Sequence, residues 1–302
     1  MTRLSLIFTT VTLALTALTV LGQTKTDTTK TNYCNWTGCT LKSEDPAHFD
    51  PYYNGHLCEN FNPAQTDFSN EYLKLRTAFH KDVPEIIGQL KKYNCNLVWL
   101  RTNSQDGVIG INYKRIKIKI LTATQDKNNP LIYHITGKSK VKDNICDFKG
   151  IITILKAYQY KESEIPKARQ GTLFAQYIFN EQTNQTHSGK FKGIVESSFL
   201  IDSTTNKIQL DTTAEIADGY FNNSFVGVWK DYKTNQEKKC IWGEYRLPFT
   251  FDFDSGDGEM HINDKYKING WETFNQPDVE YTFIKDGFSV EKNQWWTSSQ
   301  QK

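Results

Sequence analysis

Apolar and polar residues alternate along most of the chain after residue 96, and this is the strongest pattern in the sequence. A period of two places successive side chains on opposite faces of a strand. The segments with this pattern are 107–120, 131–137, 147–160, 171–180, 189–201, 206–216 and 225–232. Turn-forming residues separate them at intervals of about ten residues, which is typical of antiparallel sandwiches and barrels. We therefore expect a mainly β fold, in which an antiparallel meander forms a sandwich or a barrel.

Two shorter stretches extend this prediction. Residues 96–100 are expected to form a first, short strand. Near the other end, Asp286-Gly287 separates 279–285 from 288–292. This dipeptide favours a two-residue turn, because the turn needs positive φ at both positions. A hairpin is therefore expected there.

Helical spacing is confined to residues 66–93. A first helix, capped by Asp67 or Ser69, would present three apolar side chains on one face: Tyr72, Leu75 and Phe79. A second helix, capped by Asp82, would direct Ile86, Ile87 and Leu90 to the core. The order of helices before strands predicts a short α-helical appendage packed on a β domain.

The first 22 residues have the pattern of a secretory signal peptide. Arg3 supplies a positive charge, residues 4–21 are largely apolar, and the small residues Val20 and Gly22 suit a cleavage site. A transmembrane anchor is the alternative, since the apolar run is near the minimum length that spans a bilayer. We expect a secreted or periplasmic protein that does not span the membrane after cleavage.

The composition of the chain changes at four boundaries, of which the end of the signal peptide is the first. We expect a signal peptide over 1–22, a disordered leader over 23–32, a Cys-rich irregular and helical segment over 33–95, an antiparallel β domain over 96–294 and a polar tail over 295–302.

An even number of cysteines fits an exported chain. The six are Cys34, Cys39, Cys58, Cys95, Cys146 and Cys240. No Cys-x-x-Cys zinc pattern is present. We expect disulfides to hold the N-terminal appendage and to tie it to the β domain.

The net charge of +2 is nearly neutral, so no nucleic-acid partner is expected. The basic run at 114–119 alternates lysine with isoleucine. It predicts a half-buried strand with a solvated lysine face.

Residues 218–271 contain the only tight group of carboxylates in the sequence. Alternation over 249–254 predicts a strand, and the glycines at 256 and 258 predict a turn. The hairpin would gather four carboxylates, which are candidate ligands for calcium: Asp252, Asp254, Asp257 and Glu259. The spacing departs from that of an EF-hand, and the alternative is a solvated turn. His261 could join a metal site on the same face.

The same region holds the candidate ligand-binding residues. Trp229, Trp242 and Trp271 could stack on a sugar ring or line an apolar pocket, and Arg246 could pair with a carboxylate or stack on a tryptophan. The alternative for each is a place in the core.

Several short motifs in the second half resemble a group of uncharacterised exported proteins of the Bacteroidetes. They include Gly227-Val-Trp229, Cys240-Ile-Trp242-Gly243 and Lys265-Tyr266. The resemblance covers roughly the last half of the chain and implies an exported bacterial setting, with no activity attached. The Gly-x-Trp at 227–229 and Arg246 are also similar to a pair found in lipocalin-like barrels, although their order and spacing differ.

These observations favour an exported, non-enzymatic binding module for a glycan or a small apolar ligand. One alternative is a hydrolase of a polysaccharide or envelope component, with paired carboxylates as acid and base; further candidates for that pair are Glu196, Glu215 and Glu244. Another alternative is an envelope interaction protein without a small ligand. Whether the protein is an enzyme stays open, although no G-x-S-x-G, H-E-x-x-H or P-loop motif is present.

Overall fold

The structure is a computed structural model, and it describes residues 39–40, 60–61, 65–256, 258–274, 276–283 and 289–297. The chain divides into residues 1–31 and 32–302, and every described residue belongs to the second unit. The expected signal peptide and disordered leader lie outside the described residues.

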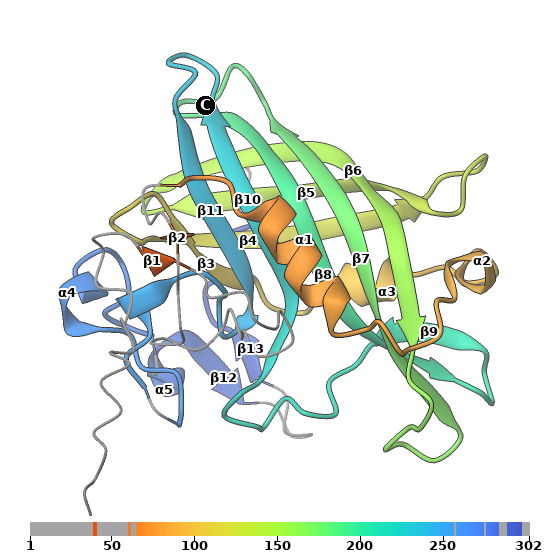
Figure 1. The fold of residues 1–302 in the computed structure, drawn as a ribbon. Helices are drawn as coiled ribbons and strands as arrows, with labels where there is room; N and C mark the ends of the chain where they lie inside the picture. The colour runs from red at the N-terminus through yellow and green to blue at the C-terminus, as the bar shows by residue number, and fades with distance from the viewer. Residues whose placement is uncertain are drawn as a thin grey trace, which may run out of the picture. The chain divides into compact units, whose positions relative to one another are not determined.

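Eight antiparallel strands of this unit close into a barrel (Figure 1). They are β3 (Gln105–Ile109), β4 (Lys114–Gln125), β5 (Ile132–Val141), β6 (Asn144–Gln159), β7 (Ala168–Glu181), β8 (Gly189–Asp202), β10 (Phe221–Asp231) and β11 (Glu237–Tyr245). Each strand pairs with the next along the chain, and β11 pairs with β3 to complete the ring. The barrel form of the predicted antiparallel meander is thus confirmed.

The remaining strand of the large sheet, β9 (Lys207–Leu210), shares an edge of β8 with β10. β9 pairs with residues 199–202, and β10 pairs with residues 189–196 of the same strand. Residues 211–220, which connect β9 to β10, therefore form an irregular seam in the barrel wall.

The sequence pattern missed two features of this sheet. Residues 107–120 were expected to be one strand, but positive φ at Gly110 and Tyr113 turns the chain there, and β3 and β4 form a hairpin. β11 was not predicted, because three charged residues at 237–239 obscure the alternation at its start.

The inside of the barrel is filled by an inner core of aromatic and branched side chains. Trp242 stacks on Phe225, with ring centroids 4.7 Å apart, and Tyr177 meets both rings edge-on. Strand glycines make room for these rings: a Cβ on Gly227 would lie 2.0 Å from a backbone oxygen and 2.8 Å from the Tyr177 hydroxyl. The middle of the barrel is thus packed with aromatic side chains.

Three helices precede the barrel. The predicted first helix is confirmed as α1 (Ser69–Ala78), which lies along the outside of β8 and β10 (Figure 1). The predicted side-chain cap is wrong, because Phe68 occupies the N-cap position. The second is the single turn α2 (Ile87–Leu90). The predicted strand at 96–100 is wrong, because the chain forms the short helix α3 (Asn96–Trp99), which packs on β4, β8 and β9. Trp99 contacts Tyr133 of the inner core and so helps to close this end of the barrel.

The chain after β11 wraps over the outside of the barrel. It forms η2 (Phe251–Phe253), α4 (Asp264–Lys267), α5 (Pro277–Glu280) and a small hairpin of β12 (Tyr281–Phe283) and β13 (Ser289–Glu291). The expected C-terminal hairpin is confirmed, and residues 284–288 between its strands lie outside the described residues. The expected strand at 249–254 is wrong: Phe249 and Phe251 have positive φ, and only Asp254 bridges to Ile262.

This wrapping segment, together with α1 and the outward faces of β3, β8, β10 and β11, buries a second set of apolar residues. We call it the outer cluster: Phe68, Tyr72, Leu75, Val108, Tyr113, Ile194, Val226, Ile241, Leu247, Phe249, Phe253, Met260, Ile262, Tyr266 and Trp271.

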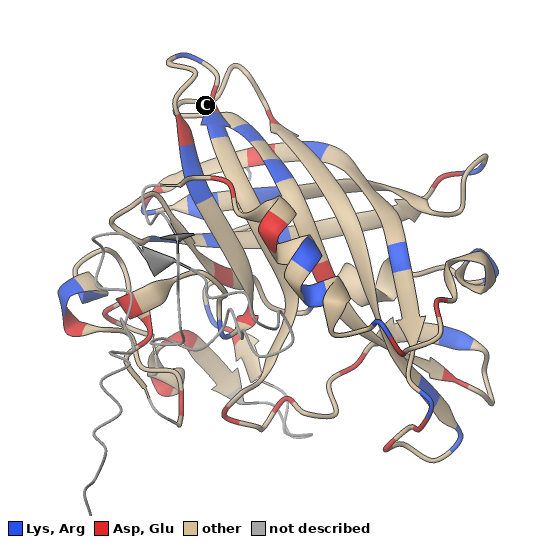
Figure 2. Cartoon of the chain, viewed as in Figure 1, with Lys and Arg blue, Asp and Glu red and all other residues tan. Residues whose placement is uncertain are grey.

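The basic face of β4 is not solvated, contrary to expectation. Arg115 pairs with Asp106 and Glu280, and Lys117 pairs with Glu291 at 3.0 Å. Two other short β-strands and α5 thus bring carboxylates to cover this face. Elsewhere, red and blue segments are interspersed over the strands, loops and helices (Figure 2). No helix in the described part of the chain has the length and apolarity needed to cross a membrane.

The expected disulfide framework needs correction for half of the cysteines. Cys95, Cys146 and Cys240 are free, buried thiols. Burial raises the pKa of Cys95 and of Cys146 to about 12, and it also holds the pKa of Cys240 well above its ordinary value. Cys34, Cys58 and the side chain of Cys39 lie outside the described part of the structure, so a disulfide among these three stays a prediction.

Candidate functional site

One end of the barrel opens into a cavity of about 700 Å³, which we call the mouth cavity. Four hairpin ends surround it, since β3, β5, β7 and β10 all finish there and β4, β6, β8 and β11 all begin there. The apolar side chains in its lining include Ile109, Ile116, Val141, Phe191 and Trp229. Its volume lies within the range of about 300–1,000 Å³ that is usual for small-molecule sites.

A buried carboxylate, Glu181, lines the mouth cavity at the end of β7. It accepts hydrogen bonds from the Ser139 hydroxyl, from the Trp229 indole Nε1 at 2.9 Å and from the Gly189 backbone N–H at 2.7 Å. All three donors are neutral, and no ion pair to Glu181 occurs among the described residues. Burial therefore raises the pKa of Glu181, although these hydrogen bonds oppose the shift.

Trp229 joins the polar and the apolar parts of this cavity. Its indole N–H donates to Glu181, and the Lys238 ammonium lies 5.2 Å from the ring centroid. This arrangement fixes the orientation of the ring. Of the four predicted ligand-binding residues, only Trp229 lines the mouth cavity.

The other three predicted ligand-binding residues are buried by contacts within the protein. Trp242 is fully buried in the inner core, and Trp271 is buried in the outer cluster, where its indole N–H donates to the Tyr113 carbonyl at 2.8 Å. Arg246 is buried and donates to the Asp218 carbonyl and to Asp254. Trp242 shares the inner core with Trp229 but does not line the mouth cavity, and neither do Trp271 and Arg246.

The predicted calcium ligands are not gathered into one site. Asp254 is buried and pairs with Arg246, while its other oxygen accepts backbone N–H groups of Gly256 and His261. Asp252 pairs with Lys265, Glu259 is exposed, and Asp257 lies outside the described residues. Over the described ranges, no group of three or more His, Cys, Asp or Glu side chains is placed to hold a metal ion.

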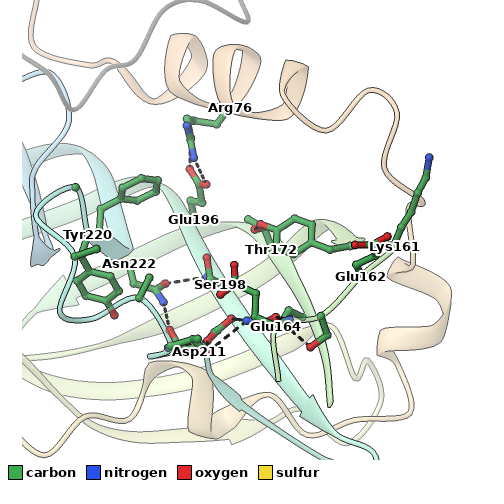
Figure 3. Close-up of a pocket in the computed structure, with 18 residues that line it drawn as sticks. Arg76, Lys161, Glu162, Glu164, Thr172, Glu196, Ser198, Asp211, Tyr220 and Asn222 are labelled. Atoms are coloured by element: carbon green, nitrogen blue, oxygen red, sulfur yellow. Dashed lines mark hydrogen bonds and ion pairs between the residues drawn. The ribbon is translucent and has the colours of Figure 1, made fainter. Parts of the chain in front are cut away.

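A second cavity, the outer groove, has a volume of about 1,090 Å³ and lies on the outside of the barrel (Figure 3). Its walls are the end of α1, the outward faces of β7 and β8, the loop at 160–164, the seam and the start of β10. Glu196 from β8 pairs with Arg76 from α1 in two hydrogen bonds, of 2.8 and 2.9 Å. The Tyr72 hydroxyl donates a third hydrogen bond to Glu196.

A third cavity, the end cleft, has a volume of about 720 Å³ and lies where β3 begins and β11 ends. Arg101 links two carboxylates in it: its Nε lies 2.8 Å from Glu244, and its Nη2 lies 3.5 Å from Glu215. Burial raises the pKa of Glu244, and the positive charge of Arg101 opposes this shift. Glu215 is exposed to solvent.

Sequence reasoning found Trp229 but missed Glu181 and the hydrogen-bonded walls of the outer groove. Glu181 ends an alternating segment, in which a carboxylate on the inward face is out of place. That mismatch is the signal that could have identified it. Comparisons with protein-family models, with curated proteins and with solved structures find no match to this chain.

Proposed function

We propose that the protein is an exported binding module, and that its mouth cavity takes a small, mainly apolar ligand with one polar group. The observation that carries this proposal is the buried carboxylate of Glu181 beside an apolar cavity. An apolar cavity with a few fixed polar groups is the usual design of a small-molecule site.

The two parts of the cavity divide the recognition between them. Ile109, Ile116 and Phe191 supply apolar area, and burying apolar ligand surface against them contributes about 25 cal/mol per Å². Glu181 and Ser139 supply the polar end, where the ligand's polar group would exchange hydrogen bonds with the carboxyl group. Three protein donors hold that carboxyl group in place before any ligand arrives.

The N-terminal sequence supports the exported setting, through the signal-peptide pattern of residues 1–22. The resemblance of the second half to exported Bacteroidetes proteins agrees with it. In the mature protein, we expect any disulfide to involve only Cys34, Cys39 and Cys58.

The first test uses the neutral apolar dye N-phenyl-1-naphthylamine and the full mature chain. Dye bound in the mouth cavity should fluoresce more strongly and should quench Trp229. Val141→Trp places a bulky ring in the cavity lining and should weaken dye binding at least tenfold. The matched control is Leu121→Trp, which puts the same ring on an exposed site of β4 and should bind as the wild type does. Equal binding by Val141→Trp, or no binding by the wild type, would overturn the proposal.

The second candidate function is hydrolysis of a glycan, and the end cleft favours it. Glu244 is a buried carboxyl group with a raised pKa, and Glu215 is a solvated carboxylate. Both form an ion pair with Arg101. Two carboxyl groups in such different surroundings can divide the roles of general acid and base.

This candidate is tested by release of reducing ends from soluble polysaccharides. Glu244→Gln should abolish activity, since an amide cannot supply the proton. Glu85→Gln, an exposed acid that lines none of the three cavities, is the control and should leave activity unchanged. Activity that survives Glu244→Gln would refute the acid–base role.

A further inference from the structure

We propose that the outer groove is a second binding site, and that it takes an uncharged oligosaccharide. This inference is independent of the mouth cavity, because the groove lies on the outer face of β7 and β8 and shares no lining residue with that cavity. Three features of the groove carry it: an aromatic platform, a row of hydrogen-bonding side chains, and buried amides that fix both walls.

The platform is the ring of Tyr160, which lines the groove and is 38% exposed. His80 stacks on it, with ring centroids 6.2 Å apart and planes 14° apart, so one face of the ring is covered by protein. The Tyr160 hydroxyl bonds to Thr172 and fixes the ring in its plane. An aromatic ring that is backed on one face and exposed to a groove is suited to stacking on the apolar face of a sugar ring.

Hydrogen-bonding groups for sugar hydroxyls lie along the groove, as the side chains of Ser198, Glu164 and Asp211 show in Figure 3. The Ser198 hydroxyl and the Glu164 carboxylate make no hydrogen bond to another described residue. Asp211 accepts bonds from Gln170 and Thr213, which leaves part of its acceptor capacity unused. These groove side chains are mainly hydrogen-bond acceptors, and the hydroxyl groups of a sugar can donate to them.

Two buried amides tie the walls of the groove together. Gln170 accepts from the Glu164 backbone N–H at 2.7 Å and donates to Asp211 at 2.7 Å, so it joins the 160–164 loop to the seam. Asn222 accepts from the Ser198 backbone N–H at 2.8 Å and donates to the Asp211 carbonyl at 2.8 Å. These contacts hold the groove in one geometry, which lowers the entropic cost of binding a flexible glycan.

The charges of the groove select against acidic glycans. Arg76 is matched by Glu196 in a two-fold ion pair. Of the other charged side chains in the lining, Glu162, Glu164 and Asp211 are acidic and Lys161 is basic. A uronic acid or sulfated sugar would meet this acidic excess, whereas an uncharged sugar would not.

The experiment titrates the full mature chain with maltotetraose, cellotetraose, mannotetraose and tetragalacturonate, and follows binding by saturation-transfer NMR and calorimetry. We expect at least one of the three uncharged tetrasaccharides to bind and tetragalacturonate not to bind. Tyr160→Ala should weaken that binding about tenfold or more, and Tyr160→Phe should keep most of it, since the ring stays. Leu155→Ala, which removes an equally exposed apolar side chain from β6, is the control.

Binding of none of the uncharged tetrasaccharides, or binding that Tyr160→Ala leaves unchanged, would overturn the proposal. Preferential binding of tetragalacturonate would overturn it as well. Val141→Trp separates this site from the mouth cavity, because it should leave oligosaccharide binding intact. Binding lost in Val141→Trp and kept in Tyr160→Ala would move the glycan to the mouth cavity and would also refute the outer site.

Discussion

The inner core and the outer cluster both bury tryptophan rings, but they are built from different kinds of chain. The inner core comes from regular strands, in which alternate residues point inward and glycines make room for aromatic rings. The outer cluster depends on irregular backbone, with positive φ at Tyr245, Phe249 and Phe251. It also encloses charged groups, among them Lys239 and the pair of Arg246 and Asp254.

This difference shows what each region needs for its stability. Paired strands satisfy each other's backbone hydrogen bonds, so the side chains of the inner core contribute to stability mainly by close packing. The wrapping segment has no regular partner strand, and side chains supply its polar contacts instead. Arg246, for example, holds the Asp218 carbonyl, Asp254 and the Gly258 carbonyl together.

The largest expected effect is at that arginine. Arg246→Met should lower the free energy of unfolding by about 3–5 kcal/mol, because it leaves the Asp254 carboxylate buried without its partner. Urea denaturation measures this loss. Lys265→Met, which breaks the more exposed pair with Asp252, is the control and should cost about 0–1 kcal/mol. Equal losses in the two variants would mean that the buried ion pair contributes no more to stability than the exposed one.

A matched pair of tryptophans sharpens the comparison. Trp271 donates its indole N–H to the Tyr113 carbonyl, whereas the Trp242 indole N–H has no partner among the described residues. Trp271→Phe should therefore cost about 0.5–1.5 kcal/mol more than Trp242→Phe, since only the first change removes a hydrogen bond. Thermal and urea unfolding of both variants give this difference. A larger loss at 242 would show that packing outweighs the polar contact.

A smaller effect, of opposite sign, is expected at Lys239. Burial lowers its pKa from the ordinary 10.5 to about 7. Between these two values the unfolded chain binds the proton and the folded protein does not, so stability rises as the pH is raised through this window. Lys239→Met should remove that rise and stabilise the protein at pH 7 by about 0.5–2 kcal/mol. The exposed Lys233→Met is the control, and an unchanged pH dependence in Lys239→Met would contradict the prediction.

The last prediction concerns thiol counts and needs no change in stability. With Cys95, Cys146 and Cys240 free, a single disulfide can use two of the remaining cysteines and leaves four of the six as thiols. Alkylation of the denatured, unreduced protein should therefore add at least four labels by mass spectrometry. In the folded protein, the three buried thiols should react slowly, because burial raises the pKa of each. Two or more disulfides would require at least one of these buried cysteines to be paired.

The same contrast explains what the sequence could predict. The strands from β4 to β8 were foreseen because each buries one face, so that its pattern repeats every two residues. The outer cluster was not foreseen, since Phe249, Phe251 and Phe253 alternate as in a strand while their backbone turns. No local pattern reveals a positive φ at a phenylalanine.

The candidate sites show the same limit. Trp229 could be singled out because a tryptophan in a strand is conspicuous. Glu181 can be identified as a candidate only from the fold, which places its hydrogen-bond donors Ser139, Gly189 and Trp229 beside it from three other strands. The outer groove depends likewise on Gln170 and Asn222, two amides that local sequence does not distinguish from surface residues.

The seam between β9 and β10 has a consequence for how the cavities communicate. Asp211, Thr213 and Ala217 line the outer groove, and Thr212, Glu215 and Ile216 line the end cleft. Neighbouring residues of this one short segment therefore line both the outer groove and the end cleft. A ligand that moves the seam from one of these cavities therefore also changes the shape of the other cavity.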